Sequence, residues 1–505
     1  MSRLVLCRLW MRNKYKIAVA VCLVLLVAAL PGVFATQGAT AQKQGEWSPP
    51  FRLSTEKGKA SEAFTTVDQH GFVHVFWSEV LADDRSIIQY ARFDGNTWST
   101  PVDVYVSQPF GAIGNISPVV DQQDTLHLVW IEGLDGPAYY TSAPASYASS
   151  AQNWQRPHRI AIRGNRAYLQ VDGNGHLHIL YIQFLGEQPG VYYTHSRDSG
   201  LTWQASTWLD PDILAGHVPR SLNFILDEAG RLHAAWYYVD NAGGGDWVRY
   251  AHSLDGGRSW SIPFTIDRLE ENNEESDKIG LSAADPVMAV QGQNVHIIWA
   301  GGELHYRNHR FSEDAGKNWS RSTRVFGNLN GQAFDGMAVD SLGRVHFVGQ
   351  IRFPQGIYHA IWEEDRWTQP SLVYLIRNDP ADVIGDHIHA HNTYPVIRDG
   401  NQLVLTFADP PPDAERRLFV MYRTLEDAPA LGPVPTPTLP VTLALEPSPT
   451  PSPTVTPLPP SFDQAAALST DGTPSPDRTI WFGLVPALLL IAATVVTRLL
   501  SKSRH

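Results

Sequence analysis

Cysteine is nearly absent from this sequence of 505 residues, which contains only Cys7 and Cys22. Both lie close to the amino terminus, so the long remainder of the chain cannot contain a disulfide bond. Secreted domains that are too small to build a large core depend on disulfides, and this chain does not use that solution. Its folded part must therefore be stabilised by a hydrophobic core alone.

Basic residues are in the minority, with 39 Lys and Arg against 51 Asp and Glu and a formal net charge of −12. Proteins that bind nucleic acid need a basic surface to neutralise phosphate groups. The acidic balance therefore argues against nucleic acid as a partner. It equally argues against adsorption to anionic surfaces.

Long apolar runs are confined to the two ends of the chain. Near the amino terminus, basic residues precede an uncharged apolar run at 17–35, and a small-residue pattern follows it at 39–41. A basic start, an apolar middle and a small-residue cleavage site are the layout of a secretory signal. Residues 1–41 are therefore expected to be either a cleaved signal peptide or an uncleaved membrane segment.

The carboxyl-terminal apolar run, residues 479–497, is long enough to cross a bilayer core of about 30 Å as a helix. Residues 498–505 form a basic tail, which is expected to stay in the cytoplasm. Residues 429–478 are rich in Pro, Thr and Ser, a composition typical of an extended, disordered stalk. We therefore expect localisation at the cell membrane, with residues 42–428 displayed on the extracellular side.

The central segment repeats one pattern seven times, at intervals of about fifty residues, and a period of this size indicates a solenoid or a propeller. Each copy reads as a β-hairpin, in which a turn of Asp, Gly and Asn residues precedes an alternating strand. A tyrosine-rich strand and a short strand with Trp usually follow, so each unit contains four antiparallel strands. The hairpins end at Trp77, Trp130, Tyr181, Trp236, Trp299, Gly349 and Phe407.

The turn between the third and fourth strands has the pattern Ser-x-Asp-x-Gly-x-(Thr/Ser/Asn)-Trp in three units. The Asp carboxylate can accept backbone N–H groups of the turn, and the Gly adopts a backbone angle that other residues resist. The Trp ring can fill the seam between neighbouring units. The pattern therefore predicts a structural role. Its matching positions are Ser196, Asp198, Gly200 and Trp203, then Ser253, Asp255, Gly257 and Trp260, then Ser312, Asp314, Gly316 and Trp319.

This turn resembles the Asp-box, or BNR repeat, of sialidase-like β-propellers, and the resemblance implies that the turns lie away from any ligand. The segment around Trp47 matches the fourth strand of other units, whereas the seventh unit lacks a Trp there. We therefore expect the amino-terminal strand to complete the last unit, which removes exposed sheet edges. The predicted fold is an all-β, seven-bladed β-propeller over residues 42–428, closed by an N-terminal strand, plus a C-terminal transmembrane helix.

Function is expected on the face of the wheel with the longer and less similar loops. Six periodic histidines of the hairpins are predicted to be packed and structural: His74, His127, His178, His233, His296 and His346. The candidate ligand-binding residues are instead irregular charges near the strand ends and the axis: Glu79, Glu132, Arg166, Arg220, Asp285, Asp335, Arg352 and Asp409. With nearby Trp and Tyr rings they could hold a sugar. The alternative is a hydrated channel rim of ordinary charges.

One run, DVIGDHIHAHN, concentrates metal-ligating side chains in the loop that enters the last unit. Alternating histidines of a strand point the same way, so two or three imidazoles could meet one divalent metal ion. The candidate ligands are Asp386, His387, His389 and His391. The alternative is a loop of solvated histidines, and the sequence requires no cofactor.

Two functions fit these features: a membrane-anchored recognition propeller for an extracellular glycan or protein partner, and an exo-sialidase. The second is implied by the resemblance, since that family holds the substrate carboxylate with three arginines and uses a Tyr nucleophile, a Glu and an acid/base Asp. Arg52, in the segment FRLS, is the nearest match to the family's Phe-Arg-Ile-Pro motif, but the Pro is missing. No catalytic residue can be assigned, and fold alone does not transfer activity. We therefore expect recognition, with a sialidase-type glycoside hydrolase as the alternative.

Overall fold

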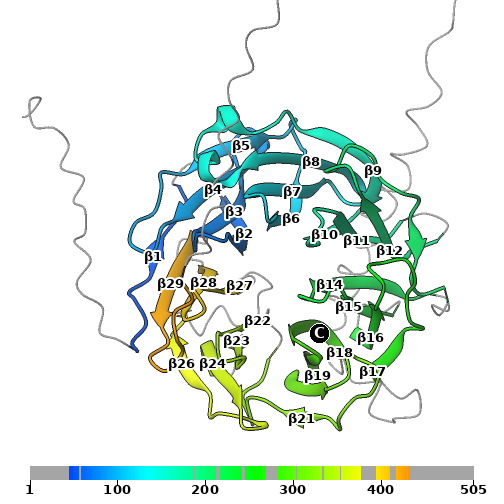
Figure 1. The fold of residues 1–505 in the computed structure, drawn as a ribbon, viewed down its shortest axis with the longest axis vertical. Coiled ribbons are helices and arrows are strands. Elements are labelled where there is room, and N and C mark those ends of the chain that lie inside the picture. The colour runs from blue at the N-terminus through cyan, green and yellow to red at the C-terminus, as the bar shows by residue number, and fades with distance from the viewer. Residues whose placement is uncertain are drawn as a thin grey trace, which may run out of the picture. The chain divides into compact units, whose positions relative to one another are not determined.

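The strands of the chain form seven antiparallel sheets arranged as blades around a common axis (Figure 1). This computed structural model describes residues 45–432 except for 56–58, 186–187, 212–215, 241–244, 269–282, 303, 332–334, 353, 377–393 and 410–416. Within that part of the chain, the arrangement confirms the predicted all-β, seven-bladed β-propeller.

Each blade is built from strands that are consecutive in the sequence, apart from the seventh. Blade 1 contains β2 (Lys59–Val67), β3 (Val73–Val80), β4 (Ser86–Phe93) and β5 (Val102–Val106); blade 2 contains β6 (Ile113–Val120), β7 (Thr125–Glu132), β8 (Gly136–Pro144) and β9 (His158–Gly164); blade 3 contains β10 (Arg166–Val171), β11 (Leu177–Gln183), β12 (Gly190–Ser196) and β13 (Thr207–Trp208). Two short 3₁₀ helices, η1 (Ala145–Tyr147) and η2 (Ala151–Asn153), lie between β8 and β9.

The remaining blades follow the same plan. Blade 4 contains β14 (Val218–Leu226), β15 (Leu232–Val239), β16 (Gly245–Ser253) and β17 (Phe264–Arg268); blade 5 contains β18 (Ala283–Gln291), β19 (Asn294–Gly301), β20 (Tyr306–Ser312) and β21 (Thr323–Arg324); blade 6 contains β22 (Asp335–Val339), β23 (Val345–Arg352), β24 (Gln355–Glu363), β25 (Arg366–Trp367) and β26 (Ser371–Tyr374); blade 7 contains β27 (Tyr394–Arg398), β28 (Gln402–Asp409), β29 (Arg417–Thr424) and β1 (Phe51–Arg52). The first strand of each blade lies nearest the axis (Figure 1).

The strand β1 comes from the amino-terminal end of the propeller and pairs with β29, with Phe51 opposite Val420. The pairing continues before β1, where the Ser48 N–H donates to the Tyr422 carbonyl at 2.8 Å and the Tyr422 N–H donates to Ser48 Oγ at 3.0 Å. The residues that follow Trp47 thus lie beside β29, the third strand of blade 7.

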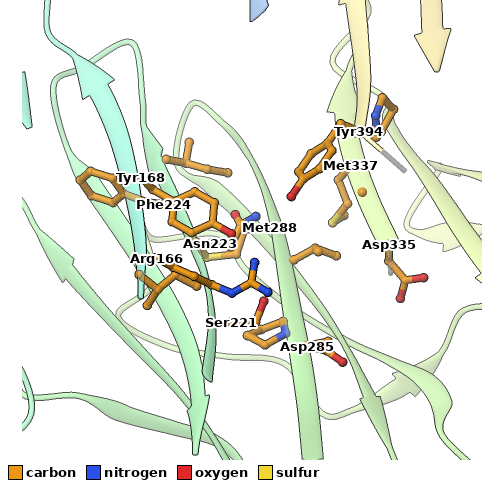
Figure 2. Close-up of a pocket in the computed structure, with 16 residues that line it drawn as sticks. Arg166, Tyr168, Ser221, Asn223, Phe224, Asp285, Met288, Asp335, Met337 and Tyr394 are labelled. Carbon is orange, nitrogen blue, oxygen red and sulfur yellow. The ribbon is translucent and has the colours of Figure 1, made fainter. Parts of the chain in front are cut away.

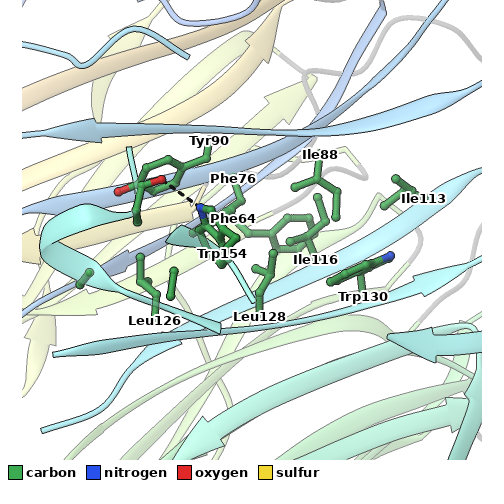
Figure 3. Packing of buried hydrophobic residues seen from close by; sticks show 13 residues of the cluster. Phe64, Phe76, Ile88, Tyr90, Ile113, Ile116, Leu126, Leu128, Trp130 and Trp154 are labelled. Carbon is green, nitrogen blue, oxygen red and sulfur yellow. Dashed lines mark hydrogen bonds between the residues drawn. The ribbon is translucent and has the colours of Figure 1, made fainter. Parts of the chain in front are cut away.

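Apolar side chains fill the seams between blades. Figure 3 shows the seam between blades 1 and 2, where Trp154 of blade 2 packs edge-on against Phe76 and Tyr90 of blade 1, with ring centroids 5.7 and 6.0 Å apart. The indole N–H of Trp154 donates to the Ala148 carbonyl at 2.9 Å, so the ring is buried without losing its hydrogen bond. These seams are the hydrophobic core that the lack of cysteine requires.

The periodic histidines are buried, as predicted, and in four blades each accepts a hydrogen bond from a tyrosine of the third strand. The pairs are His74–Tyr90, His127–Tyr140, His178–Tyr193 and His233–Tyr250, with Nδ1 to phenol oxygen distances of 2.8, 2.7, 2.7 and 2.7 Å. In the first pair, His74 Nε2 faces a carboxylate oxygen of Asp68 at 3.2 Å. Because a carboxylate only accepts, Nε2 carries the proton and Nδ1 accepts from the phenol.

The eight-residue turns stabilise the same seams. In the turn of blade 3, the Thr202 N–H donates to Asp198 Oδ1 at 2.8 Å and the Gly200 N–H donates to Ser196 Oγ at 2.9 Å, so these two side chains hydrogen-bond with the backbone of their own turn. The turns of blades 4 and 5 repeat both bonds, donated by Ser259 and Gly257 and by Asn318 and Gly316. Their carboxylates therefore serve the scaffold.

The glycine of this turn makes room for the tyrosine of the preceding blade. Gly200 has φ +86°, and a Cβ atom there would lie 2.7 Å from ring atoms of Tyr140. The Tyr140 hydroxyl oxygen also lies 3.0 Å from the Ser199 carbonyl oxygen. The neighbouring Trp203 packs on the same ring, with centroids 6.4 Å apart. Any other residue at Gly200 would be strained by both its backbone angle and this contact.

Blades 5 and 6 replace the tyrosine by a second histidine. His296 Nδ1 lies 3.1 Å from His309 Nε2, and His346 Nδ1 lies 3.0 Å from His359 Nε2, with the two rings of each pair stacked. All four imidazoles are buried. These pairs place ionisable groups where the other blades have neutral phenols.

No helix among the described residues is long and apolar enough to span a membrane. The expected signal segment 1–41, the stalk 429–478 beyond residue 432, and the expected transmembrane helix 479–497 lie outside the described residues.

The histidine pairs make stability depend on pH. Burial lowers the pKa of His296 to about 4 and holds the pKa of His309 well below its usual range. The unfolded chain, with histidine pKa values near 6.5, therefore binds protons first as the pH falls. We expect the free energy of unfolding, measured by urea titration, to fall between pH 6.5 and 4.5 by up to about 1.4 kcal/mol per pH unit for each such histidine.

The variant His309→Gln removes one of these groups and should lose less stability over that pH interval than the wild type. The variant Phe311→Leu alters packing on the same imidazole without removing a titratable group, so it should keep the wild-type pH dependence. Equal pH dependence in His309→Gln and wild type would contradict this account.

Candidate functional site

A cavity of about 200 Å³ lies at the axis, walled by the first strands of five blades. It is lined by Arg166, Tyr168, Ser221, Leu222, Asn223, Phe224, Ile225, Asp285, Pro286, Val287, Met288, Asp335, Gly336, Met337, Tyr394 and Pro395, from β10, β14, β18, β22 and β27 (Figure 2). Most of these residues lie in the first half of their strand. The first strands begin on the same face as the loops between second and third strands, which is the face predicted to carry function.

Strand alternation decides which side chains reach the cavity. In β10, Arg166 and Tyr168 are half-buried, whereas Ala167 and Leu169 between and after them are fully buried in the seam. Side chains of a strand point alternately to opposite faces, so Arg166 and Tyr168 share the axial face. Figure 2 shows the guanidinium of Arg166 pointing towards the middle of the cavity, with the phenol of Tyr394 directed into the same space from another wall.

Asp285 is placed by an irregularity in β18. The pairing of β18 with β19 shifts between Ala284 and Val287, which marks a β-bulge that includes Asp285 and Pro286. Asp285 has φ +49°, a left-handed backbone angle that is costly for a residue other than glycine. Bulges redirect side chains and are frequent beside active sites. The backbone thus bears strain to aim this carboxylate at the cavity.

A buried phenol connects Asp285 with two arginines. Tyr237 of β15 is 9 % exposed and hydrogen-bonds with the Asp285 side chain. Burial raises the pKa of Tyr237, the carboxylate of Asp285 raises it further, and the charges of Arg166 and Arg220 lower it. Burial prevails, so the phenol remains protonated at neutral pH. The Tyr237–Asp285 pair therefore lies within electrostatic reach of two guanidinium groups.

Asp335 is the most deeply buried charge of the site. It forms a bidentate pair with Arg307, whose Nη2 lies 3.2 Å from Asp335 Oδ1, and Arg307 also donates to the carbonyls of Gly331 and Gln350 at 2.8 and 2.9 Å. Burial raises the pKa of Asp335 to about 6, against the attraction of Arg307, and the charge of Asp285 raises it further. Asp335 and Arg307 thus form a buried ion pair, and Asp335 contributes to the cavity wall together with Asp285.

The structure brings Arg166, Asp285 and Asp335 together in the cavity wall but places two predicted residues elsewhere. Glu79 is fully buried and accepts from the Thr55 N–H at 2.9 Å, the Thr55 hydroxyl at 2.7 Å and the Trp77 indole at 2.9 Å. Glu132 accepts from the Tyr105 hydroxyl at 2.9 Å. Neither lines the cavity, because each carboxylate is used to hold neighbouring strands.

The remaining candidates differ in position. Arg220 lies on β14 directly before Ser221, which lines the cavity, whereas Arg352 ends β23 outside the cavity wall. Asp409 ends β28, and its side chain is outside the described residues. Arg52 lies on β1, the outermost strand of blade 7, and its guanidinium donates to the Thr55 carbonyl at 2.8 Å. It is therefore not part of the axial site.

The proposed metal ligands Asp386, His387, His389 and His391 lie outside the described residues. Among the residues that the structure does describe, no group of three or more His, Cys, Asp or Glu side chains could hold a metal ion. The histidine cluster remains a prediction, which metal analysis of the protein and of a variant with His389 and His391 changed to Ala would test.

Sequence reasoning missed several residues of the site, namely Tyr168, Asn223, Tyr237 and Tyr394. Three of them lie on first strands, whose alternation could have identified them once the axial face was known. Tyr237 lies on a second strand, in the position after the periodic aromatic residue Trp236, and only its neighbours in space reveal its role.

The buried ion pair generates a stability prediction. Asp335→Asn leaves the Arg307 guanidinium buried without its counter-charge, and arginine cannot release its proton. We expect a loss of about 3–5 kcal/mol in the free energy of unfolding, measured by denaturant titration. Changing both residues, as Arg307→Met with Asp335→Leu, should cost less than Asp335→Asn alone. A double variant that is less stable than Asp335→Asn would count against this interpretation.

Comparisons with known proteins show similarity in fold. No protein-family model matches the sequence, and no curated protein sequence matches it. An ulvan lyase of polysaccharide lyase family PL25 superposes with a TM-score of 0.50 at 11% identity, over 74% of this chain and 95% of that one. A variant of NanB sialidase from Streptococcus pneumoniae gives 0.41 at 14% identity, over 74% and 70%. A protein of unknown function from Dyadobacter fermentans gives 0.46 at 13%, over 76% and 100%.

Proposed function

We propose that the propeller binds an acidic glycan in its axial cavity. The observation that carries this proposal is the position of Arg166, whose guanidinium faces the cavity among Tyr168, Asn223 and Tyr394. A guanidinium binds a carboxylate or sulfate group through two parallel hydrogen bonds, and amide and phenol groups can bond sugar hydroxyls. The chain as a whole has a net charge of −12 and repels anions. Arginines near the axis therefore favour binding of one anionic group at that place rather than over the surface.

The fold comparison supports the choice of ligand. The PL25 ulvan lyase that shares the fold has also been solved bound to -[GlcA(1-4)Rha3S]-, a saccharide with both a uronic acid and a sulfated sugar, at a TM-score of 0.50. That ligand belongs to the lyase. For this chain, we therefore choose uronic-acid oligosaccharides as the first ligands to test.

A sialidase-type hydrolase is the second candidate, because Tyr237 and Asp285 form a phenol–carboxylate pair beside Arg166 and Arg220. A nucleophilic phenol would need to lose its proton. Burial raises the pKa of Tyr237 and so keeps the proton on the phenol at neutral pH. This favours binding over nucleophilic attack.

We also propose that the propeller is displayed on the outer side of a membrane, anchored by residues 479–497 and spaced from it by the stalk 429–478. The apolar and proline-rich composition of these segments supports the proposal. We further propose that β1 closes the ring, which its pairing with β29 supports, and that the three eight-residue turns are Asp-box repeats.

Binding can be measured by titration calorimetry of the full-length protein with a glucuronic-acid oligosaccharide. Arg166→Ala should weaken binding by about 10-fold or more, the effect of losing a hydrogen-bonded charge, and Arg166→Lys should recover only part of it. Arg159→Ala, an exposed residue of β9, is the matched control and should bind as the wild type does.

Equal affinity of Arg166→Ala and wild type would overturn the proposed site. Release of a fluorophore from a sialoside by the wild type, with loss in Tyr237→Phe, would replace binding by hydrolysis as the main function.

A further inference from the structure

Asp135 joins the loops of two neighbouring blades on the face of the cavity. It lies between β7 and β8, and its carboxylate accepts the Phe184 N–H at 2.9 and 3.0 Å and also the Leu185 N–H. Asp135 is 5 % exposed and has φ +49°. A non-glycine residue in the left-handed region is held there by its surroundings, and such strain gathers at functional sites. Asp135 therefore fixes the backbone of blade 3 at Phe184.

Phe184 in turn contacts an arginine of the next blade. The Arg220 guanidinium carbon lies 4.7 Å from the centroid of the Phe184 ring, within the range of a cation–π interaction. The Phe184 ring also packs against the core cluster between blades 3 and 4, which includes Leu222. The Phe184 ring thus packs against the core and also contacts an arginine that is otherwise exposed.

Arg220 lies next to the axial site. In the pairing of β14 with β15, the irregular residues Arg220 and Ser221 lie opposite Tyr237, and Ser221 lines the cavity. The charges of Arg220 and Arg166 both lower the pKa of the Tyr237 phenol, which hydrogen-bonds with Asp285. Arg220 is exposed and follows Pro219 in β14, where the pairing with β15 shifts, so no regular strand geometry fixes its side chain. A long side chain in that situation samples many rotamers unless something holds it.

We propose that Phe184, fixed by Asp135, is the positioning residue that holds Arg220 as the second guanidinium of the anion site. The inference rests on the proposed function, since it assigns Arg220 to the same acidic glycan that Arg166 binds. Holding the guanidinium before the ligand arrives removes part of the entropy lost on binding. Three blades therefore build one half of the site, through Asp135, Phe184 and Arg220.

A double-mutant cycle on the full-length protein tests this inference. The probe is the glucuronic-acid oligosaccharide, and the readouts are Kd and its dependence on NaCl concentration. Arg220→Ala should weaken binding by about 10-fold and reduce the salt dependence, because one charge contact is lost. Phe184→Leu should weaken binding by about 3-fold, and adding Phe184→Leu to Arg220→Ala should cause no further loss.

Two further variants separate positioning from general damage. Phe184→Tyr keeps an aromatic face and should recover most of the affinity that Phe184→Leu loses. Asp135→Asn tolerates the left-handed backbone and keeps an acceptor but loses its charge. It should weaken binding in the wild type but not in Arg220→Ala, and it serves as the second route if Phe184→Leu does not fold.

The outcomes are distinguishable. Losses that add in the Phe184→Leu and Arg220→Ala double variant, or unchanged binding in Phe184→Leu and Asp135→Asn, would overturn the positioning role. Unchanged binding in Arg166→Ala as well as Arg220→Ala would instead overturn the proposed function. Weak binding in Arg166→Ala with normal binding in Arg220→Ala would leave the function standing and overturn the inference alone.

Discussion

The propeller depends on one contact that recurs at the seams: a buried aromatic side chain of one blade's third strand packs beneath the turn of the next blade. In blade 2 that side chain is Tyr140, which hydrogen-bonds with His127 of its own blade and whose ring lies against Gly200 of blade 3. A hydroxyl buried without a partner would be costly, so the histidine is as necessary as the ring. Blades 3 and 4 repeat the contact, and the scaffold therefore needs no disulfide bond.

Blades 5 and 6 show what this contact requires. Blade 5 has His309 in place of the tyrosine, and the following turn, in blade 6, has neither the Ser nor the Gly of the motif. Trp362 of β24 and Trp367 of β25, on either side of that turn, pack against the imidazole instead, with centroids 4.8 and 5.1 Å away. The Gly and the tyrosine are thus missing at the same seam. This is expected if the role of the Gly is to make room for the tyrosine ring. At this seam, two tryptophan rings fill the space that the tyrosine and the glycine turn occupy at the other seams.

The sequence was sufficient for the scaffold because the scaffold is periodic. Seven copies of one hairpin predict the blades, and the regular spacing of His127 and its equivalents predicts their burial. The site is not periodic, so the same reasoning found only part of it. Glu79 and Asp285 both looked like charges near strand ends. The Thr55 and Trp77 N–H groups donate to Glu79, whereas a β-bulge in β18 places Asp285 in the cavity wall. Tyr237 had no signal, since its partners are distant in sequence.

The bulges in the first strands explain how one scaffold yields both framework and site. In blade 2 the bulge places Asn115, whose side-chain oxygen accepts the Ala167 N–H of the neighbouring first strand at 2.7 Å. In blades 4 and 5 the corresponding bulges contain Arg220 and Asp285, whose charges both act on the Tyr237 phenol. A β-bulge in the first strand therefore provides a hydrogen bond between neighbouring first strands in blade 2, and places a charged residue near the cavity in blades 4 and 5. Strain at Asp285 is tolerable because the apolar clusters on both sides of blade 5 hold the ring.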